Sequence, residues 1–202
     1  MSSASRKLIQ ASGAVAGGEA PDTGDDDFAN VVLLLDGDGT SDDDNNTFTD
    51  SSTNAHTITR NGNVTQGSFS PYGDNWSNYF DGSSSLKFNS SGDYNLGVGD
   101  FTIEGWFYKT ASTASQTIVS SGSYYTAGAN GNWVLRITSA TQIAFATYNG
   151  TGNEEYSEFS AATSLNTWHH FALVREGTGT NQTKFYLDGV LAGSMTVSKS
   201  LS

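Results

Sequence analysis

The sequence predicts an all-β protein in which two antiparallel sheets pack face to face as a sandwich. The chain has 23 Gly, 9 Tyr, 11 Phe and 4 Trp with only 15% charged residues, a composition typical of turn-rich β proteins. Short apolar or alternating runs recur along it between Gly, Ser and Asn clusters. No window sustains apolar residues at helical spacing with caps. A length of 202 residues suits one such core.

The N-terminal segment, residues 1–28, is small and polar, with few apolar residues, so it cannot build a core of its own. We predict an extended arm, either disordered or docked on a partner, followed by a sandwich domain over residues 29–202. The arm has the basic pair Arg6 and Lys7 followed by Leu8 and Ile9. This pattern is too short for a lipid anchor and favours docking on another protein.

The domain opens with a continuous apolar run at residues 31–35, which predicts a buried first strand. An acidic loop follows it. Further strands are expected at residues 57–60, 78–81, 86–88, 101–109, 116–121, 132–138, 142–148, 168–175, 184–187 and 190–196, separated by turn-forming residues.

Residues 165–193 are the clearest part of the pattern. The strand at 168–175 has apolar or aromatic residues on both of its faces. Both faces must therefore be buried against other parts of the protein, which predicts a sandwich. The pair Asp188 and Gly189 supplies the positive φ angles of a tight two-residue hairpin between the last two strands.

Three segments carry a family resemblance. The motif WHHFALVR followed by FYLDGVLAG, together with NYFDGSSSLKF at residues 78–88 and DFTIEGWFY at 100–108, resembles the LamG-like, concanavalin A-like jelly roll of the laminin G/pentraxin branch. The resemblance covers residues 31–202 and implies a two-sheet antiparallel jelly roll. Such relatives usually close with a further long strand, so we expect either that the sequence is a fragment of a longer polypeptide or that the N-terminal segment or a partner chain supplies the missing edge. Jelly rolls serve as lectins, glycosidases, adhesion modules and virion proteins, so the fold does not select an activity.

Charge and composition exclude several classes of function. The net charge of -12, with nine scattered Lys and Arg residues, argues against a nucleic-acid partner. The sequence has no run of about 18 apolar residues, which a membrane-spanning helix would need. The first 20 residues also lack the apolar stretch of a signal peptide. The absence of cysteine excludes disulfides and thiolate chemistry.

The acidic loop at residues 36–47 begins like an EF-hand. Ser41 stands where the sharp turn needs glycine, and Thr47 stands where the bidentate glutamate belongs, so the loop is not an EF-hand. Clustered oxygens can still hold Ca²⁺, as in some LamG relatives, and a solvated loop is the alternative. The candidate ligands are Asp36, Asp38, Asp42 and Asp44.

Catalytic chemistry is not predicted. A glycosidase needs two carboxylates about 5–5.5 Å or about 6.5–9.5 Å apart. Glu104 stands alone in its strand, whereas residues 154–158 form a polar loop with three glutamates. His169 and His170 are adjacent in one strand and point to opposite faces, so they cannot share a metal ion and are expected to pack.

Carbohydrate recognition uses aromatic rings that stack on sugars and amide groups that bind hydroxyls. The alternative is that loop aromatics cap the ends of the core. Trp106, Trp133 and Trp168 are expected within the core. The candidate glycan-binding residues in or beside polar loops are Trp76, Tyr124, Tyr125, Asn130, Asn132, Tyr148 and Asn149.

Taken with the resemblance, these features predict a non-enzymatic structural or adhesion protein of a phage virion, of capsid-decoration or tail-fibre type. Its partners would be other virion proteins through the arm, further copies of itself, and host-surface glycans. The alternative is a free carbohydrate-binding lectin domain of a bacterial surface or exported protein.

Overall fold

The computed structural model describes residues 7–10, 27–37, 46–67, 69–72, 76–88, 92–112, 115–122, 130–149 and 155–202. Its contacts divide the chain into two compact units. The first unit contains residues 1–7, 92–103 and 107–202, and the second contains residues 8–91 and 104–106.

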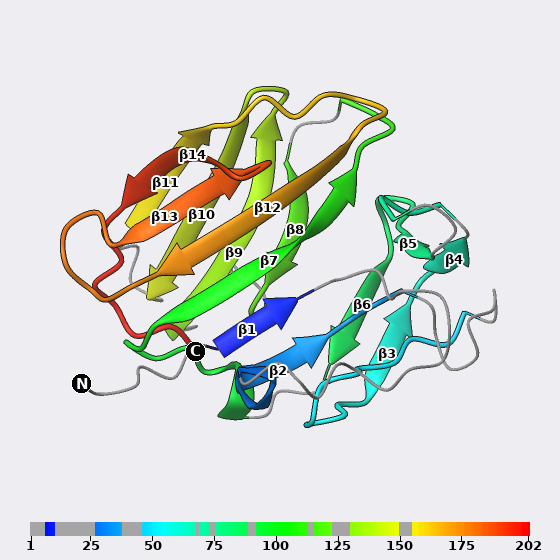
Figure 1. Cartoon of the computed structure of the whole chain (residues 1–202), viewed down its shortest axis with the longest axis horizontal. Coiled ribbons are helices and arrows are strands. Elements are labelled where there is room, and N and C mark those ends of the chain that lie inside the picture. The colour runs from blue at the N-terminus through cyan, green and yellow to red at the C-terminus, as the bar shows by residue number, and fades with distance from the viewer. Residues whose placement is uncertain are drawn as a thin grey trace. The chain divides into compact units, whose positions relative to one another are not determined.

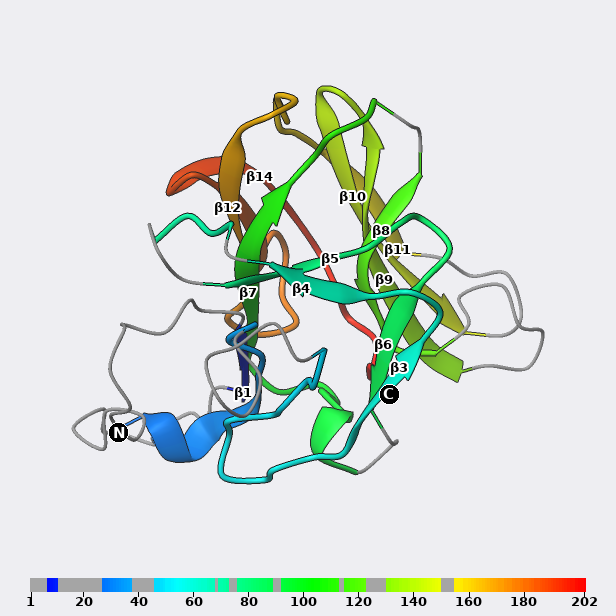
Figure 2. The same cartoon turned by 90° about the vertical axis from the view of Figure 1, so that its right-hand side faces the viewer.

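Two sheets build the first unit, and Figures 1 and 2 show them as separate layers. One sheet follows the order β14-β13-β12-β7 within this unit, from strands Val190–Met195, Thr183–Leu187, Trp168–Arg175 and Phe101–Tyr108. The other follows the order β11-β10-β9-β8, from strands Glu155–Ser160, Gln142–Asn149, Asn130–Ser139 and Gln116–Ser120. A short 3-10 helix, η2, spans Gly92–Tyr94. This is the antiparallel sandwich that the sequence predicts.

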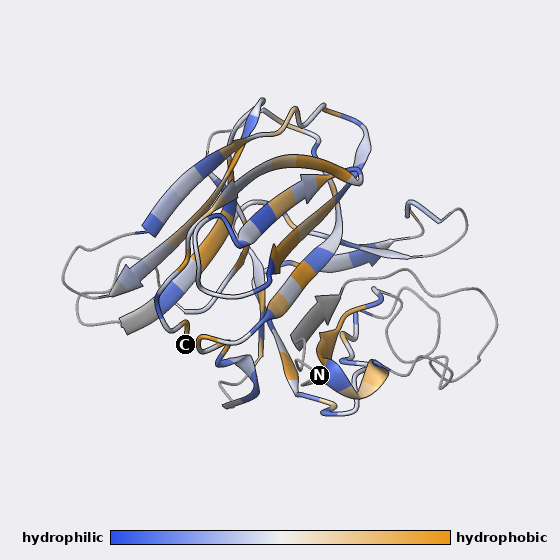
Figure 3. Ribbon diagram, turned by 60° about the vertical axis from the view of Figure 1, so that its left-hand side comes forward, coloured by the Kyte–Doolittle hydropathy of each residue, from blue (hydrophilic) through white to orange (hydrophobic). Residues whose placement is uncertain are grey.

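The core of this unit lies between the two sheets. Hydrophobic and hydrophilic residues alternate along several strands, so each strand turns one row of side chains inward (Figure 3). Phe159 of β11 stacks on Phe185 of β13, with ring centroids 5.1 Å apart and an interplanar angle of 11°. A Cβ atom at Gly193 would lie 3.0 Å from Cδ1 of Phe159, so a side chain at this strand position would require the ring to shift by a few tenths of an ångström. The other large buried side chains of the core include Leu135, Phe145 and Leu173.

The hairpin between β13 and β14 has the predicted turn. Asp188 has φ 51° and Gly189 has φ 77°, and Leu187 faces Val190 across the turn. Both positive angles match the type I′ geometry that favours Asp-Gly, so this prediction is confirmed.

Arg175 ends β12 as a buried cation, with 1% of its surface exposed. Its guanidinium donates to the carbonyl oxygens of Gly99 at 2.8 Å, Gly97 at 2.8 Å and Leu96 at 3.1 Å. The group also lies over the ring of Phe101, 4.7 Å from the centroid. Arg175 thereby ties the segment that precedes β7 to the end of β12.

The second unit contains short strands. Strand β2, Val31–Leu34, is fully buried, as its continuous apolar run predicts, and follows the 3-10 helix η1, Phe28–Asn30. Figure 2 shows two antiparallel pairs. They are β3 with β6, Ile58–Asn61 with Ser85–Phe88, and β4 with β5, Thr65–Gly67 with Ser77–Tyr79.

The arm contributes a strand to this unit. Strand β1, Lys7–Gln10, pairs in parallel with β2, and Leu8 and Ile9 face Val31 and Leu33. These two apolar residues, expected to dock on another protein, therefore have a pairing partner in their own chain. Arg6 lies outside the described residues, and docking of the arm on a partner stays a prediction.

Two predictions from the sequence are wrong. Residues 155–158, expected in a polar loop, lie in strand β11, where Phe159 faces the core with 2% of its surface exposed. Of the three tryptophans expected in the core, Trp133 is 2% exposed, whereas Trp106 and Trp168 are half-buried. The Trp106 indole N–H donates to the Tyr72 hydroxyl at 2.7 Å, a bond that favours a position beside polar groups.

Candidate functional site

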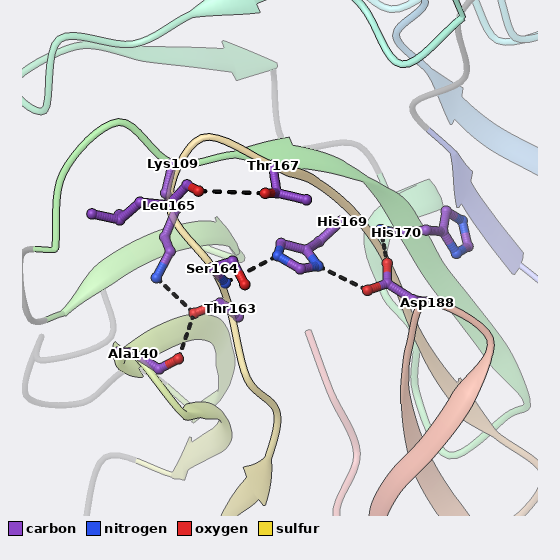
Figure 4. Close-up of polar contacts among 9 residues, drawn as sticks. All are labelled: Lys109, Ala140, Thr163, Ser164, Leu165, Thr167, His169, His170 and Asp188. Atoms are coloured by element: carbon purple, nitrogen blue, oxygen red, sulfur yellow. Dashed lines mark hydrogen bonds and ion pairs between the residues drawn. The ribbon is translucent and has the colours of Figure 1, made fainter.

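A polar cluster near the hairpin turn surrounds His169, which is 6% exposed (Figure 4). Its Nδ1 lies 2.8 Å from Oδ2 of Asp188, and its Nε2 accepts the backbone N–H of Ser164 at 3.0 Å. Because Nε2 accepts a hydrogen bond, it carries no proton. The ring proton therefore lies on Nδ1, which donates it to the Asp188 carboxylate. Oδ1 of Asp188 accepts the backbone N–H of His170 at 2.9 Å.

This cluster has the residue types of a hydrolase triad without its geometry. A general base needs a lone pair within reach of the hydroxyl that it activates, but Nε2 is occupied by the backbone amide of Ser164. The rings of His169 and His170 point in different directions, as expected for neighbours in a strand (Figure 4). The cluster therefore holds the hairpin turn against the segment that precedes β12.

Lys109, the residue directly after β7, supports the same segment. It is 6% exposed, and its Nζ donates to Oγ1 of Thr163 at 2.6 Å. That hydroxyl donates in turn to the carbonyl oxygen of Ala140 at 3.2 Å. Burial lowers the pKa of Lys109 because the charged ammonium loses water.

The β11-β10-β9 sheet carries a second group of polar and aromatic side chains on the face opposite the core. In β10, Tyr148 faces Asn132, and Ala146 faces Val134 on one side and Tyr156 on the other. Alternate residues of a strand share a face, so these side chains lie on one surface with Arg136, Gln142, Ala144 and Glu158. Ala144 and Ala146 are fully buried at its centre, and Tyr148 packs against Val134 and Ala146.

Glu158 is the fixed anion of this surface. Its Oε1 accepts the Tyr156 hydroxyl at 2.6 Å, and its Oε2 accepts Nε2 of Gln142 at 2.9 Å. The bond from Tyr156 is the main cause that lowers the pKa of Glu158, with a smaller contribution from the charge of Arg136. The pKa of Tyr156 is raised, first by burial and then by Glu158, so the hydroxyl keeps its proton and donates.

We call this surface the polar aromatic face and define it by Asn132, Arg136, Gln142, Tyr148, Tyr156 and Glu158. It combines a 45% exposed tyrosine ring with planar hydrogen-bonding groups in fixed positions. Such a combination can stack on a sugar ring and bind its hydroxyls.

The predicted glycan-binding residues fall into three groups. Asn132 and Tyr148 are neighbours on the polar aromatic face, whereas the half-buried Trp76 belongs to the second unit. Asn130 and Asn149 face each other between β9 and β10, but their side chains, like the residues Tyr124 and Tyr125, lie outside the described part of the chain. Tyr156 and Glu158 were missed because residues 155–158 read as a loop, since the segment lacks a simple apolar alternation. Arg136 and Gln142 lie in predicted strands, but no pattern along those strands marked them as binding residues.

The described glutamates of β11 do not form the pair that glycoside hydrolysis requires. Glu155 and Glu158 are three residues apart in one strand, so they point to opposite faces. Oε1 of Glu155 instead accepts the backbone N–H and the hydroxyl of Ser198, at 3.0 and 2.6 Å.

Of the predicted metal ligands, Asp36 is described, and its Oδ2 accepts the Ser51 hydroxyl at 2.6 Å. Asp38, Asp42 and Asp44 lie outside the described residues. Within the described ranges, His, Cys, Asp and Glu form no group of three that could hold a metal ion. In the same part of the chain, no helix is long and apolar enough to span a bilayer.

Comparison with known proteins agrees with the fold. The family model described as the concanavalin A-like lectin/glucanases superfamily matches residues 80–202, which is more than half of the chain. A search of curated proteins found no match. The matched region includes the β7 to β14 strands that build the sandwich. The chain therefore belongs to the concanavalin A-like lectin/glucanase superfamily.

Proposed function

We propose that this protein is a non-enzymatic adhesion module that binds glycans through the polar aromatic face. The observation that carries the proposal is the exposed ring of Tyr156 beside Glu158, whose two oxygens are held by Tyr156 and Gln142. Sugar recognition benefits from such preorganised groups, because little conformational freedom is lost when the ligand binds. Membership in a superfamily of lectins and glucanases supports the ligand class.

The polar aromatic face favours binding over hydrolysis. Hydrolysis needs a second carboxylate across the sugar from the first, one of them held protonated. Glu158 has a lowered pKa and is therefore an ionised hydrogen-bond acceptor, which is unsuited to act as a general acid. Glu155 points away from it. The chemistry available at Glu158 is the binding of hydroxyl groups.

A glycan array with the whole chain tests the proposal, followed by titration of the best-bound glycan. Tyr156→Ala removes the ring and the donor to Glu158, and we expect its dissociation constant to rise at least tenfold. The control is Tyr79→Ala, because Tyr79 is also exposed but belongs to the second unit. Equal weakening by both variants, or an array without binding, would contradict the proposal.

The place of action that we propose is a phage virion, as a capsid-decoration or tail-fibre component that forms homo-oligomers. The family resemblance and the basic pair Arg6 and Lys7, of which Lys7 is the first residue of β1, support this proposal. Reversing both charges to Glu is expected to keep the pairing of Leu8 and Ile9 with β2, because neither of these two residues is changed. We expect lower occupancy of assembled particles by this variant, measured by quantitative mass spectrometry. Unchanged occupancy would favour the alternative, a free lectin domain on a bacterial surface or exported from the cell.

A further inference from the structure

The polar aromatic face carries one cation and one anion. Arg136 is the single Lys or Arg residue in the four strands β8 to β11. Ala144 of β10 pairs with Arg136 on one side and with Glu158 on the other, so the three side chains share a face. Because Ala144 has only a methyl group, the two long charged side chains have room to approach each other above it.

The hydroxyl of Tyr156 joins the two charges. Arg136 donates a side-chain hydrogen bond to this hydroxyl, which itself donates to Oε1 of Glu158 at 2.6 Å. The bond from Tyr156 and, to a smaller degree, the charge of Arg136 lower the pKa of Glu158, so its carboxylate is ionised at neutral pH. The cation and the anion therefore belong to one hydrogen-bonded network, in which their charges offset each other.

The free capacity of this network fits a hydroxyl group. Three side chains bond the carboxylate of Glu158, namely Tyr156, Thr138 and Gln142. A carboxylate accepts about four hydrogen bonds, so one position stays open on this exposed side chain. A sugar hydroxyl can donate a proton to that position.

An acidic group on the sugar has no such place. A sulfate or an ionised carboxylate has no proton to donate to Glu158, and it would meet a like charge there. The charge of Arg136 is already offset by Glu158 and is not available to a second anion. At longer range, the net charge of -12 also opposes the approach of an anionic glycan.

We propose that the polar aromatic face selects uncharged saccharides and rejects sulfated or carboxylated ones. This selectivity rests on the glycan binding proposed above, to which it adds the chemical class of the ligand. Glu158 is the residue that determines it, because like charges brought together at an interface oppose binding and so exclude the wrong partner.

A glycan array of matched sets tests the selectivity. Each set holds a neutral oligosaccharide, the same oligosaccharide with one sulfate, and the same oligosaccharide with one uronic acid. We expect the whole chain to bind the neutral member about tenfold or more tightly than either acidic member. Titration of the best set in solution gives the ratio of dissociation constants.

The variant Glu158→Gln assigns the selectivity to one residue. Glutamine keeps the size of the side chain and an acceptor for Tyr156, but it leaves Arg136 without its counter-charge. We expect the ratio between acidic and neutral dissociation constants to fall about tenfold or more. The matched control is Glu176→Gln, which changes the net charge equally but pairs with Lys184, a residue of the other sheet, and should keep the wild-type ratio. Circular dichroism checks that both variants fold.

The outcomes separate this selectivity from glycan binding itself. An array without any binding overturns both proposals. Binding that favours the acidic members, or does not distinguish them from the neutral ones, overturns the selectivity and leaves glycan binding in place. An equal fall of the ratio in both variants would trace the selectivity to the total charge of the chain, and it would overturn the role of Glu158.

Discussion

Replacement of Arg175 by Met tests the reasoning about the buried cation. Methionine keeps most of the apolar volume but removes the guanidinium. The carbonyl oxygens of Leu96 and Gly99 then lose the Arg175 donors, whereas Gly97 still accepts the backbone N–H of Leu201 at 2.9 Å. Two orphaned buried acceptors cost about 1–3 kcal/mol each, or about 2–6 kcal/mol together. The variant also avoids the desolvation penalty of the buried guanidinium charge, and this gain offsets part of the lost stability.

We therefore expect Arg175→Met to lower the free energy of unfolding by about 2–4 kcal/mol. For a chain of this size, that corresponds to a fall of about 4–16 °C in the melting temperature, measured by calorimetry. The control is Lys184→Met, because the Lys184 to Glu176 pair at 2.8 Å is solvent-exposed and contributes less than about 1 kcal/mol. A melting temperature for Arg175→Met within about 2 °C of the wild type would refute this account of the buried cation.

Three further predictions concern the first unit. Gly193→Ala should destabilise the protein by about 1–3 kcal/mol in urea unfolding, because its Cβ would press on the stacked ring of Phe159; a neutral effect would show that this ring can move. Asp188→Ala should cost about 2–4 kcal/mol in the same assay, since two N–H donors lose their acceptor and alanine disfavours positive φ, whereas Asp188→Asn, which tolerates positive φ and keeps one of the two acceptors, should cost less. The pKa of Lys109 is lowered from 10.5 by burial, so the unfolded chain binds more protons than the folded one between the lowered pKa and 10.5, and stability should rise with pH across that window. Lys109→Met should remove this rise in thermal melts recorded from neutral to alkaline pH, and a rise of the same size in the variant would assign it to another group.

The candidate site was only partly predictable from the sequence. Asn132 and Tyr148 could be singled out because each lies beside a Gly-rich loop, but their position as cross-strand neighbours depends on the register of β9 and β10. Glu158 was assigned to a loop because the two apolar side chains nearest to it, Tyr156 and Phe159, are three residues apart and so lie on opposite faces of the strand. Such an edge strand lacks the simple alternation by which strands are recognised.

The buried polar groups were harder still to predict. Gln66 and Asn78 are ordinary polar residues in the sequence, separated by a segment rich in Ser and Gly. Each has a buried side-chain oxygen without a hydrogen-bond partner, a feature that appears only when β4 and β5 pair and the segment after β2 folds over them. Arg175 follows the same rule, since its partners are carbonyl oxygens of residues 96–99, which carry no sequence signal.

Local patterns by themselves determined the all-β class, most of the strands and the Asp188-Gly189 turn, because alternation and turn chemistry act between residues close in the chain. Tertiary structure alone decided which polar groups are paired, which side chains share the outer face of the β11-β10-β9 sheet, and with which strand Leu8 and Ile9 pair. These properties depend on contacts between segments that are distant in the sequence. A buried polar group is paired only if the fold brings a suitable hydrogen-bond partner to it.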